Sequence, residues 1–163
     1  HLVENFVWDP QFLRVFALHH ETGEAMPEQM IQQLRNSRND FSAIERQNQI
    51  TYALFDQKLF GRPDPSQPST TEIFAKLHKD NDIPFAEGTH WHSRFGHLVT
   101  YGAGYYGDLY SQVFAGDIWQ HCFEGDSLRR KSGERLWQNM LIHGGAKDPS
   151  VMLTDLLGRP PKE

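Results

Sequence analysis

A short stretch at residues 95–107 holds one histidine, three tyrosines and four glycines, and it leads into an apolar segment. Glycine permits backbone conformations with positive φ and lets another chain lie close to the backbone. Histidine and tyrosine supply hydrogen-bond donors that can be aimed at a developing negative charge. This composition indicates a loop that binds a peptide or an oxyanion. Spacing alone also fits a plain turn at Gly102 and Gly104 whose tyrosines pack in a core.

Three further segments accompany this stretch. Residues 2–9 read Leu-Val-Glu-Asn-Phe-Val-Trp-Asp, residues 55–57 read Phe-Asp-Gln, and residues 143–149 read His-Gly-Gly-Ala-Lys-Asp-Pro. In this order and at these separations, the four segments resemble the C-terminal part of the thimet-type zinc oligopeptidases. The resemblance is strongest to the mitochondrial intermediate (octapeptidyl) peptidase branch in its plant and algal forms, and it covers essentially the whole chain. It implies the multi-helix C-terminal portion of an all-α catalytic domain.

The resemblance also implies roles for five residues. His97 and Tyr101 match a histidine and a tyrosine that lie over the zinc site in related peptidases and contact the substrate or the tetrahedral intermediate. We therefore expect these two to be catalytic. Tyr105, Gly102 and Gly104 are expected to bind substrate, because they belong to the same loop and the glycines would let it close over a peptide. One phenol donor at an oxyanion contributes on the order of 3 kcal/mol.

The zinc ligands of the family are absent from this sequence. Such peptidases bind zinc through a His-Glu-x-x-His helix and a glutamate on the next helix, and neither that motif nor its inverse His-x-x-Glu-His occurs here. Glu4 matches a later glutamate of the second helix, about two turns beyond the zinc ligand. We therefore expect a fragment or processed product that begins just after the metal site. Zinc is expected only if a partner segment supplies the ligands, and the isolated chain is expected to be inactive.

Asp108 is a second departure from the family pattern. Related peptidases have a tyrosine here that donates to the oxyanion, whereas a carboxylate accepts hydrogen bonds and repels negative charge. Tyr110 is a nearby tyrosine that could substitute, but it lies about 200° around a helix from Asp108 and so points elsewhere. The departure favours an alternative function, a degenerate remnant that acts as a non-catalytic structural subunit of a mitochondrial assembly such as a ribosome or respiratory complex. A third hypothesis is a peptide-binding module that keeps the loop without the cleavage chemistry.

Composition bounds the possible partners. The chain has 163 residues, 38% of them hydrophobic and 12% aromatic, which predicts a folded core. A net charge of −5 and a pI near 6.0 give no signature for direct nucleic-acid binding. No apolar run approaches the about 20 residues of a membrane span.

The resemblance implies the mitochondrial matrix as the location and a peptide as the substrate. It also implies either a missing N-terminal peptidase half or a larger mitochondrial assembly as the partner. Exposed apolar faces at residues 6–16 would favour the missing half.

The remaining histidine pattern has a plainer interpretation. His90, His92 and His97 form a His-x-His-x4-His cluster that could suggest a metal site. Zinc sites usually recruit ligands at spacings fixed on a helix or finger, often with cysteine or a carboxylate. We therefore interpret these side chains as ordinary polar or packed histidines. The single cysteine, Cys122, excludes an internal disulfide and is expected to pack as a small apolar side chain.

Apolar periodicity predicts helices over most of the chain and a single all-α unit over 1–163. Helices are expected near 6–17 with a break at Asp9 and Pro10, from Pro27, and over 41–60, 72–78, 105–123, 127–141 and 149–157, with a short helix inside the irregular segment 83–104. The expected starting residues are Asn39 or Asp40, Ser69 or Thr70, Asp126 or Ser127, and Asp148. The expected stops are Gly23, Gly61, Gly144 and Gly158, and a loop is expected around Pro63, Pro65 and Pro68.

Overall fold

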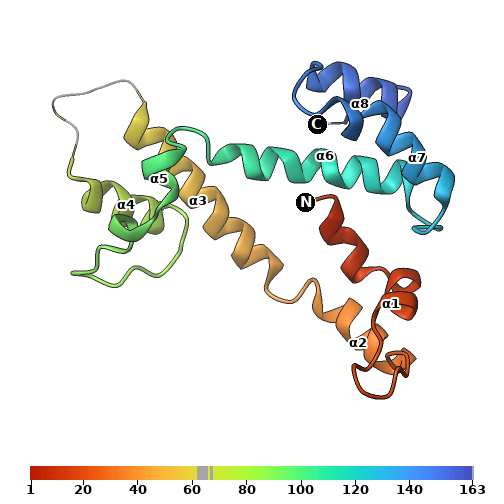
Figure 1. Cartoon of the computed structure of the whole chain (residues 1–163). Coiled ribbons are helices and arrows are strands. Elements are labelled where there is room, and N and C mark those ends of the chain that lie inside the picture. The colour runs from red at the N-terminus through yellow and green to blue at the C-terminus, as the bar shows by residue number, and fades with distance from the viewer. Residues whose placement is uncertain (62–65, 67, 163) are drawn as a thin grey trace. The chain divides into compact units, whose positions relative to one another are not determined.

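The computed structural model describes residues 1–61, 66 and 68–162, and it is built from helices joined by loops (Figure 1). Its α-helices are α1 (Pro10–Phe16), α2 (Glu28–Ser37), α3 (Ser42–Phe60), α4 (Thr70–Asp80), α5 (His97–Thr100), α6 (Tyr106–Cys122), α7 (Arg130–Asn139) and α8 (Pro149–Leu157). Short 3-10 helices lie at η1 (Val3–Trp8), η2 (Trp91–Arg94) and η3 (Leu141–His143). In the described residues, β-type pairing is limited to one isolated antiparallel bridge between Leu18 and Ala25. The predicted all-α class is confirmed.

The chain divides into two compact units. Unit 1 contains His1–Asp40 and Ser111–Glu163, and unit 2 contains Phe41–Tyr110. One boundary therefore lies just before α3 and the other lies within α6. Each unit has a hydrophobic core of its own. The expectation of a single all-α unit over 1–163 stays a prediction.

The core of unit 1 forms between α6 and α8. It contains five buried side chains: Ile118, Phe123, Leu153, Leu156 and Leu157. Leu156 and Leu157 follow Leu153 by three and four positions, so all three face the same side of α8. The ring of Phe6 from η1 adds edge-to-face contacts with Trp119 and Phe123, at centroid distances of 4.9 and 5.3 Å. Such aromatic pairs stabilise a core by about 0.5–1.5 kcal/mol beyond the area that they bury.

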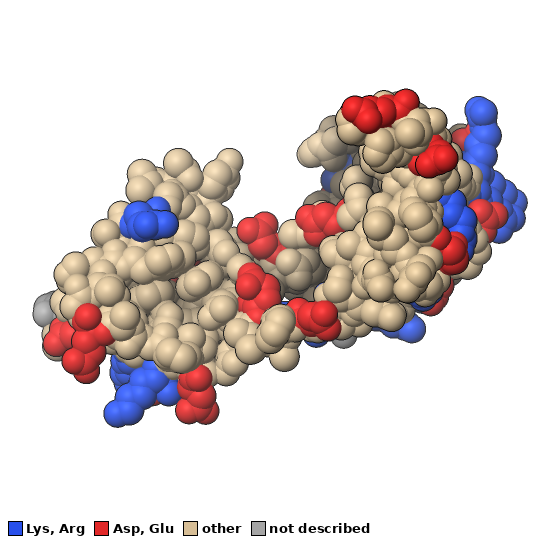
Figure 2. Space-filling model, turned by 90° about the horizontal axis from the view of Figure 1, so that it is seen from below, with Lys and Arg blue, Asp and Glu red and all other residues tan. Residues whose placement is uncertain are grey.

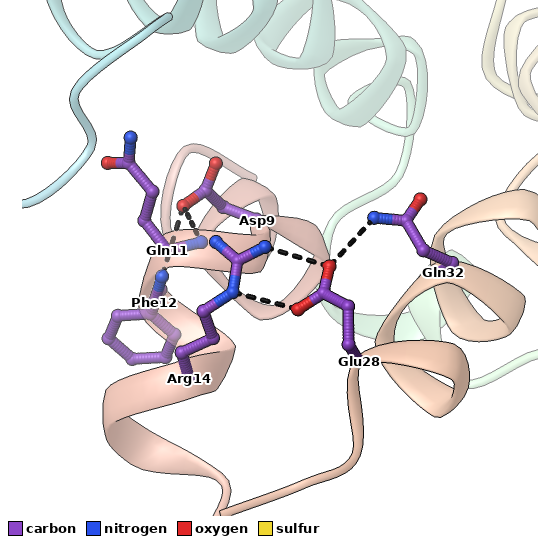
Figure 3. Close-up of polar contacts among 6 residues, drawn as sticks. All are labelled: Asp9, Gln11, Phe12, Arg14, Glu28 and Gln32. Atoms are coloured by element: carbon purple, nitrogen blue, oxygen red, sulfur yellow. Dashed lines mark hydrogen bonds and ion pairs between the residues drawn. The ribbon is translucent and has the colours of Figure 1, made fainter.

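The start of α1 is set by Asp9, as Figure 3 shows. One carboxylate oxygen, Oδ1, accepts the backbone N–H groups of Gln11 and Phe12 at 3.0 and 3.1 Å. Pro10 occupies the first helical position, where its missing N–H costs nothing and its fixed φ suits the helix. The expected break at Asp9 and Pro10 is therefore confirmed.

A charged pair joins α1 to α2. Arg14 donates from Nε and Nη2 to the two carboxylate oxygens of Glu28, at 2.9 and 2.8 Å (Figure 3). Gln32 adds a hydrogen bond to Glu28 at 3.1 Å from the next turn of α2. These hydrogen bonds, that from Arg14 above all, hold the pKa of the Glu28 carboxyl below its ordinary value.

The C-terminal segment is tied to α6 by a bidentate ion pair. Asp117 is only 7% exposed. It accepts from Arg159 Nη1 and Nη2 at 2.9 and 2.5 Å, and from the backbone N–H of Lys162 at 3.0 Å. The hydrogen bonds from Arg159 are the main reason that the pKa of Asp117 falls from 3.8 to about 2.

This ion pair predicts a loss of stability in acid. A carboxyl group with a lowered pKa in the folded state stabilises that state above its unfolded pKa and loses the effect as it becomes protonated. Asp117→Asn should therefore lower the free energy of unfolding at pH 7 by on the order of 1 kcal/mol, a figure reduced for the exposure of Arg159. The difference should close as the pH falls from 3.8 toward about 2. Urea unfolding of both proteins across that range measures it, and a difference that persists at the lowest pH contradicts the assignment.

The core of unit 2 forms between α3 and α4. Phe55 of α3 is fully buried and meets Phe74 of α4 edge to face at 5.0 Å. Ile73 and Leu77 complete the buried cluster, one turn apart on α4. Trp91 of η2 stacks on Tyr52 at 4.6 Å, so the segment before the glycine-rich stretch packs onto α3.

Two helix starts differ from expectation. Neither Asn39 nor Asp40 caps α3, because the residue before the helix is Phe41 in a left-handed conformation with φ of 58°, and no side chain caps it. The prediction that Asp126 or Ser127 caps the next helix was also wrong, since α7 begins after Arg129. The hydroxyl of Ser127 is committed elsewhere, donating to Asp9 Oδ1 at 2.6 Å.

Gly23 was wrong as the stop of the first helix, because α1 already ends at Phe16, whereas four other expected ends agree with the structure. Ser69 and Glu72 form a reciprocal capping box at α4, Asp148 caps α8, and Gly158 closes α8 with φ of 70°. Gly61 ends α3 in an extended conformation, where a Cβ would lie 2.7 Å from the carbonyl oxygen of Gln57. The expected loop residues Pro63 and Pro65 lie outside the described residues.

The surface carries many large apolar side chains. Phe16 is 69% exposed, and Val3 and Val15 are similarly open in unit 1. Figure 2 shows the charged side chains of one face in small separate groups among broad uncharged areas. In the described part of the chain, no helix combines the length and the apolar character needed to cross a membrane.

Candidate functional site

Residues 97–105, here called the glycine-tyrosine loop, follow η2 and lead into α6. The loop opens with the single helical turn of α5, which ends as the N–H of Tyr101 donates to the carbonyl of His97 at 2.8 Å. A tight turn follows, closed by the N–H of Gly104 on the carbonyl of Tyr101 at 3.0 Å. Ala103 lies inside that turn with φ of 63°, a conformation that residues with a Cβ rarely adopt. The expected short helix within 91–99 is thus present as two single turns.

Three of the predicted site residues lie together in this loop. The ring of His97 meets that of Tyr105 edge to face at 4.7 Å and lies 5.7 Å from that of Tyr101. The Nε2 atom of His97 is buried without a hydrogen-bond partner among the described residues. Tyr101, in contrast, is 70% exposed. The arrangement places an accessible phenol beside a half-buried imidazole, which suits hydrogen bonding to a polar ligand.

Tyr105 differs from Tyr101 in its surroundings. It is half-buried, and its hydroxyl donates to Oε1 of Gln49 on α3 at 2.5 Å. Burial, and after it the charge of Asp108, raises the pKa of the Tyr105 phenol. The group therefore stays protonated near neutral pH with its hydrogen committed to Gln49. Tyr105 can form a wall of the site, while Tyr101 is the accessible donor.

Helix α3 holds the loop through residues that the sequence did not single out for this purpose. Asp56 is 0% exposed; its Oδ1 accepts the N–H of Ala103 at 2.9 Å, and its Oδ2 accepts the N–H of Tyr105 at 3.0 Å. Gln57 donates from Nε2 to the carbonyl of Ala103 at 2.7 Å. Two signals in the sequence mark Asp56: it follows the core residue Phe55 on the apolar face of a helix, and it belongs to the Phe-Asp-Gln segment at 55–57 that resembles the family.

The two predicted glycines have packing roles. A Cβ on Gly102 would lie 2.8 to 3.0 Å from three carbons of the Phe60 ring, so any larger residue would displace that ring or lift the loop from α3. A Cβ on Gly104 would lie 3.1 Å from the carbonyl oxygen of Tyr101. The loop therefore fits tightly on α3 in this conformation. Its closure over a substrate stays a prediction.

Asp108 lies exposed in the first turn of α6. A negative charge near a helix N-terminus is favourable, which gives this residue a local stabilising role. The charge of Asp108 also raises the pKa of the Tyr105 phenol, so Asp108 interacts electrostatically with the loop.

The histidines before the loop make local contacts. His90 Nδ1 lies 3.0 Å from the hydroxyl of Thr71, and His92 Nε2 lies 3.2 Å from that of Thr70. Burial lowers the pKa of His92, which favours the neutral ring. Both contacts join η2 to the start of α4. Within the described ranges, no three His, Cys, Asp or Glu side chains are grouped so that they could hold a metal ion. The described His, Cys, Asp and Glu side chains therefore do not fit a zinc site.

Comparison with known proteins places this chain in a family. The whole chain, residues 1–163, matches the model described as peptidase family M3. The chain belongs to peptidase family M3. The resemblance drawn from the sequence motifs is thereby confirmed.

Several relatives of this M3 chain are mitochondrial intermediate peptidases. It is 44% identical over 159 residues to that of Arabidopsis thaliana, 38% identical over 161 residues to that of Mus musculus, and 37% identical over 163 residues to that of Neurospora crassa. These matches cover 97, 98 and 96% of this chain but only 22, 22 and 20% of the three relatives. The chain therefore spans about a fifth of their length.

Proposed function

We propose that this M3 chain forms the substrate-loop region of a mitochondrial intermediate peptidase-like zinc metalloendopeptidase of the mitochondrial matrix. The observation that carries the proposal is the exposed phenol of Tyr101 beside the half-buried His97 ring, on a loop that α3 fixes by hydrogen bonds. Membership of the family supports the assignment of peptide as the substrate class.

Each loop residue has a distinct part in this proposal. Tyr101 donates its hydroxyl hydrogen to the oxygen of the scissile carbonyl as negative charge develops there. His97 offers a buried Nε2 without a partner, and a buried polar atom left unpaired costs about 1–3 kcal/mol. Peptide binding that opens the loop and exposes Nε2 would let a peptide N–H donate to it and remove that cost. Tyr105 and the glycine backbone shape the wall against which the peptide lies.

The metal belongs to another part of the enzyme in this proposal. Since the described residues do not fit a zinc site, the ligands come from an N-terminal peptidase part that packs with this chain. Exposed apolar side chains such as Val15 and Phe16 support a partner of this kind, because contiguous exposed apolar surface marks interaction sites. Zinc, when bound there, supplies the activation of the attacking water.

Peptide cleavage by the complete protein in which the chain occurs tests this function. A synthetic precursor peptide with an N-terminal octapeptide should be cut after the octapeptide, and a zinc chelator should abolish the cut until zinc is restored. The circular dichroism of the 163-residue chain itself should not change with the chelator. Cleavage that survives complete removal of zinc contradicts the proposal.

A non-catalytic role is the second candidate, and Asp108 is the observation that favours it. In this role the chain is a structural subunit of a mitochondrial assembly such as a ribosome or respiratory complex. Purification from the native source separates the two candidates. Recovery in a large assembly without zinc and without peptidase activity would support the structural role, whereas recovery with about one zinc and a His-Glu-x-x-His segment would support the peptidase.

A further inference from the structure

We propose that Asp56 is a positioning residue, whose buried carboxylate fixes the turn that presents Tyr101 to substrate. The role rests on the proposed function of the glycine-tyrosine loop. Asp56 touches no substrate in this account and acts through the loop backbone.

The two oxygens of Asp56 are matched to the loop. Oδ1 accepts from Ala103 and Oδ2 accepts from Tyr105, at 2.9 and 3.0 Å, so the carboxylate brackets Gly104 from both sides. A buried carboxylate is costly unless hydrogen bonds compensate it, and bonds to an ionised acceptor are among the strong ones. An asparagine in its place offers one acceptor oxygen and turns an NH₂ donor toward the other N–H. The paired hydrogen bonds to Ala103 and Tyr105 therefore require a carboxylate and not merely a polar side chain.

The turn depends on this outside support. Ala103 has φ of 63°, and such backbone conformations persist where the surroundings determine them. Three residues of α3 support this backbone: Asp56 on two N–H groups, Gln57 on the carbonyl of Ala103, and the Phe60 ring under Gly102. Three residues within little more than one turn of α3 thus hold the backbone of the loop.

The support reaches Tyr101 through the same turn. The carbonyl of Tyr101 accepts the N–H of Gly104, which lies between the two residues bound by Asp56. Tyr101 is exposed, and its ring lies 5.7 Å from that of His97. Its phenol is therefore directed by the backbone of the turn. Loosening the bracket should move that phenol relative to His97 without disturbing the core.

Amide hydrogen exchange in the complete protein tests the bracket. In Asp56→Asn, the exchange rates of the Ala103 and Tyr105 N–H groups should rise at least about tenfold, because each bond to the charged oxygen is lost or weakened. The matched control is Asp80→Asn, the same change at an exposed carboxylate of α4, which should leave both rates unchanged. Unchanged loop exchange in Asp56→Asn overturns the proposal. So does an equal rise across the α3 and α4 amides, which would indicate general destabilisation.

A second variant keeps the test decisive if Asp56→Asn does not fold. Gln57 is exposed, so Gln57→Glu should fold normally while replacing the donor to the Ala103 carbonyl by a repelling acceptor. The same two loop amides should then exchange about threefold or more faster. No acceleration in this folded variant would overturn control of the loop by α3.

Enzyme kinetics separate this proposal from the proposed function. If Asp56 acts through Tyr101, the two changes should be strongly non-additive in a double-mutant cycle. Tyr101→Phe should lower kcat about a hundredfold in the parent protein but less than about tenfold beside Asp56→Asn. Full additivity overturns the positioning role even if the loop binds substrate. An inactive protein would contradict the proposed function, and the exchange rates would still decide whether Asp56 fixes the loop.

Discussion

Tyr101→Phe is expected to lower kcat for peptide cleavage by the complete protein about a hundredfold, with little change in folding. The change removes one hydroxyl from a side chain that is 70% exposed, so no core contact is lost. A donor that acts on developing negative charge is felt in kcat more than in KM. Steady-state kinetics with the octapeptide-bearing precursor give both constants.

Tyr106→Phe is the matched control for that change. Tyr106 is 54% exposed at the start of α6, outside the glycine-tyrosine loop, and it loses the same hydroxyl. Its kcat should stay within about twofold of the parent protein, as expected for a surface change away from a site. Equal kinetic constants for Tyr101→Phe and the parent protein would remove Tyr101 from the chemistry.

Phe55→Ala should produce the largest loss of stability, about 3–5 kcal/mol in the free energy of unfolding of unit 2. Phe55 is fully buried between α3 and α4, and a smaller residue there loses its contacts with Phe74 and leaves a cavity. Urea unfolding combined with amide exchange should show the loss in α3 and α4. The amides of α8 should be less affected, because unit 1 has its own core.

Leu156→Ala provides the reciprocal experiment. Leu156 is fully buried in unit 1, and its truncation should cost about 2–5 kcal/mol and act mainly on α7 and α8. If either variant instead speeds exchange equally in every helix, the two units unfold together. That result would contradict separate stability and support the predicted single all-α unit.

The parts of the fold that the sequence predicts are those that depend on local chemistry. Ser69 and Glu72 satisfy each other within one turn, Asp148 binds N–H groups two and three residues ahead, and Gly158 adopts a positive φ. Asp40 and Ser127 had equally suitable side chains and do not cap. Factors beyond the local side chain decide those cases: Phe41 precedes α3 in a left-handed conformation without a side-chain cap, and Ser127 binds Asp9 across 118 positions.

The same division applies to the candidate site. The three aromatic site residues, His97, Tyr101 and Tyr105, lie within nine residues of one another in the sequence. Their proximity therefore follows from the spacing of the motif together with the family resemblance. The contact of Asp56 with Ala103 joins residues 47 positions apart, and no periodicity reveals it. Gly102 could be recognised as a loop glycine, but its reason, the Phe60 ring beneath it, is visible only in three dimensions.

Photo-crosslinking tests most directly whether residues 97–105 bind peptide. A precursor peptide with a benzophenone group beside the scissile bond would be irradiated with the complete protein, and the attachment sites mapped by mass spectrometry. If residues 97–105 bind peptide, the benzophenone should attach within them, and excess unlabelled peptide should suppress the attachment. Suppressible attachment confined to other segments would contradict it.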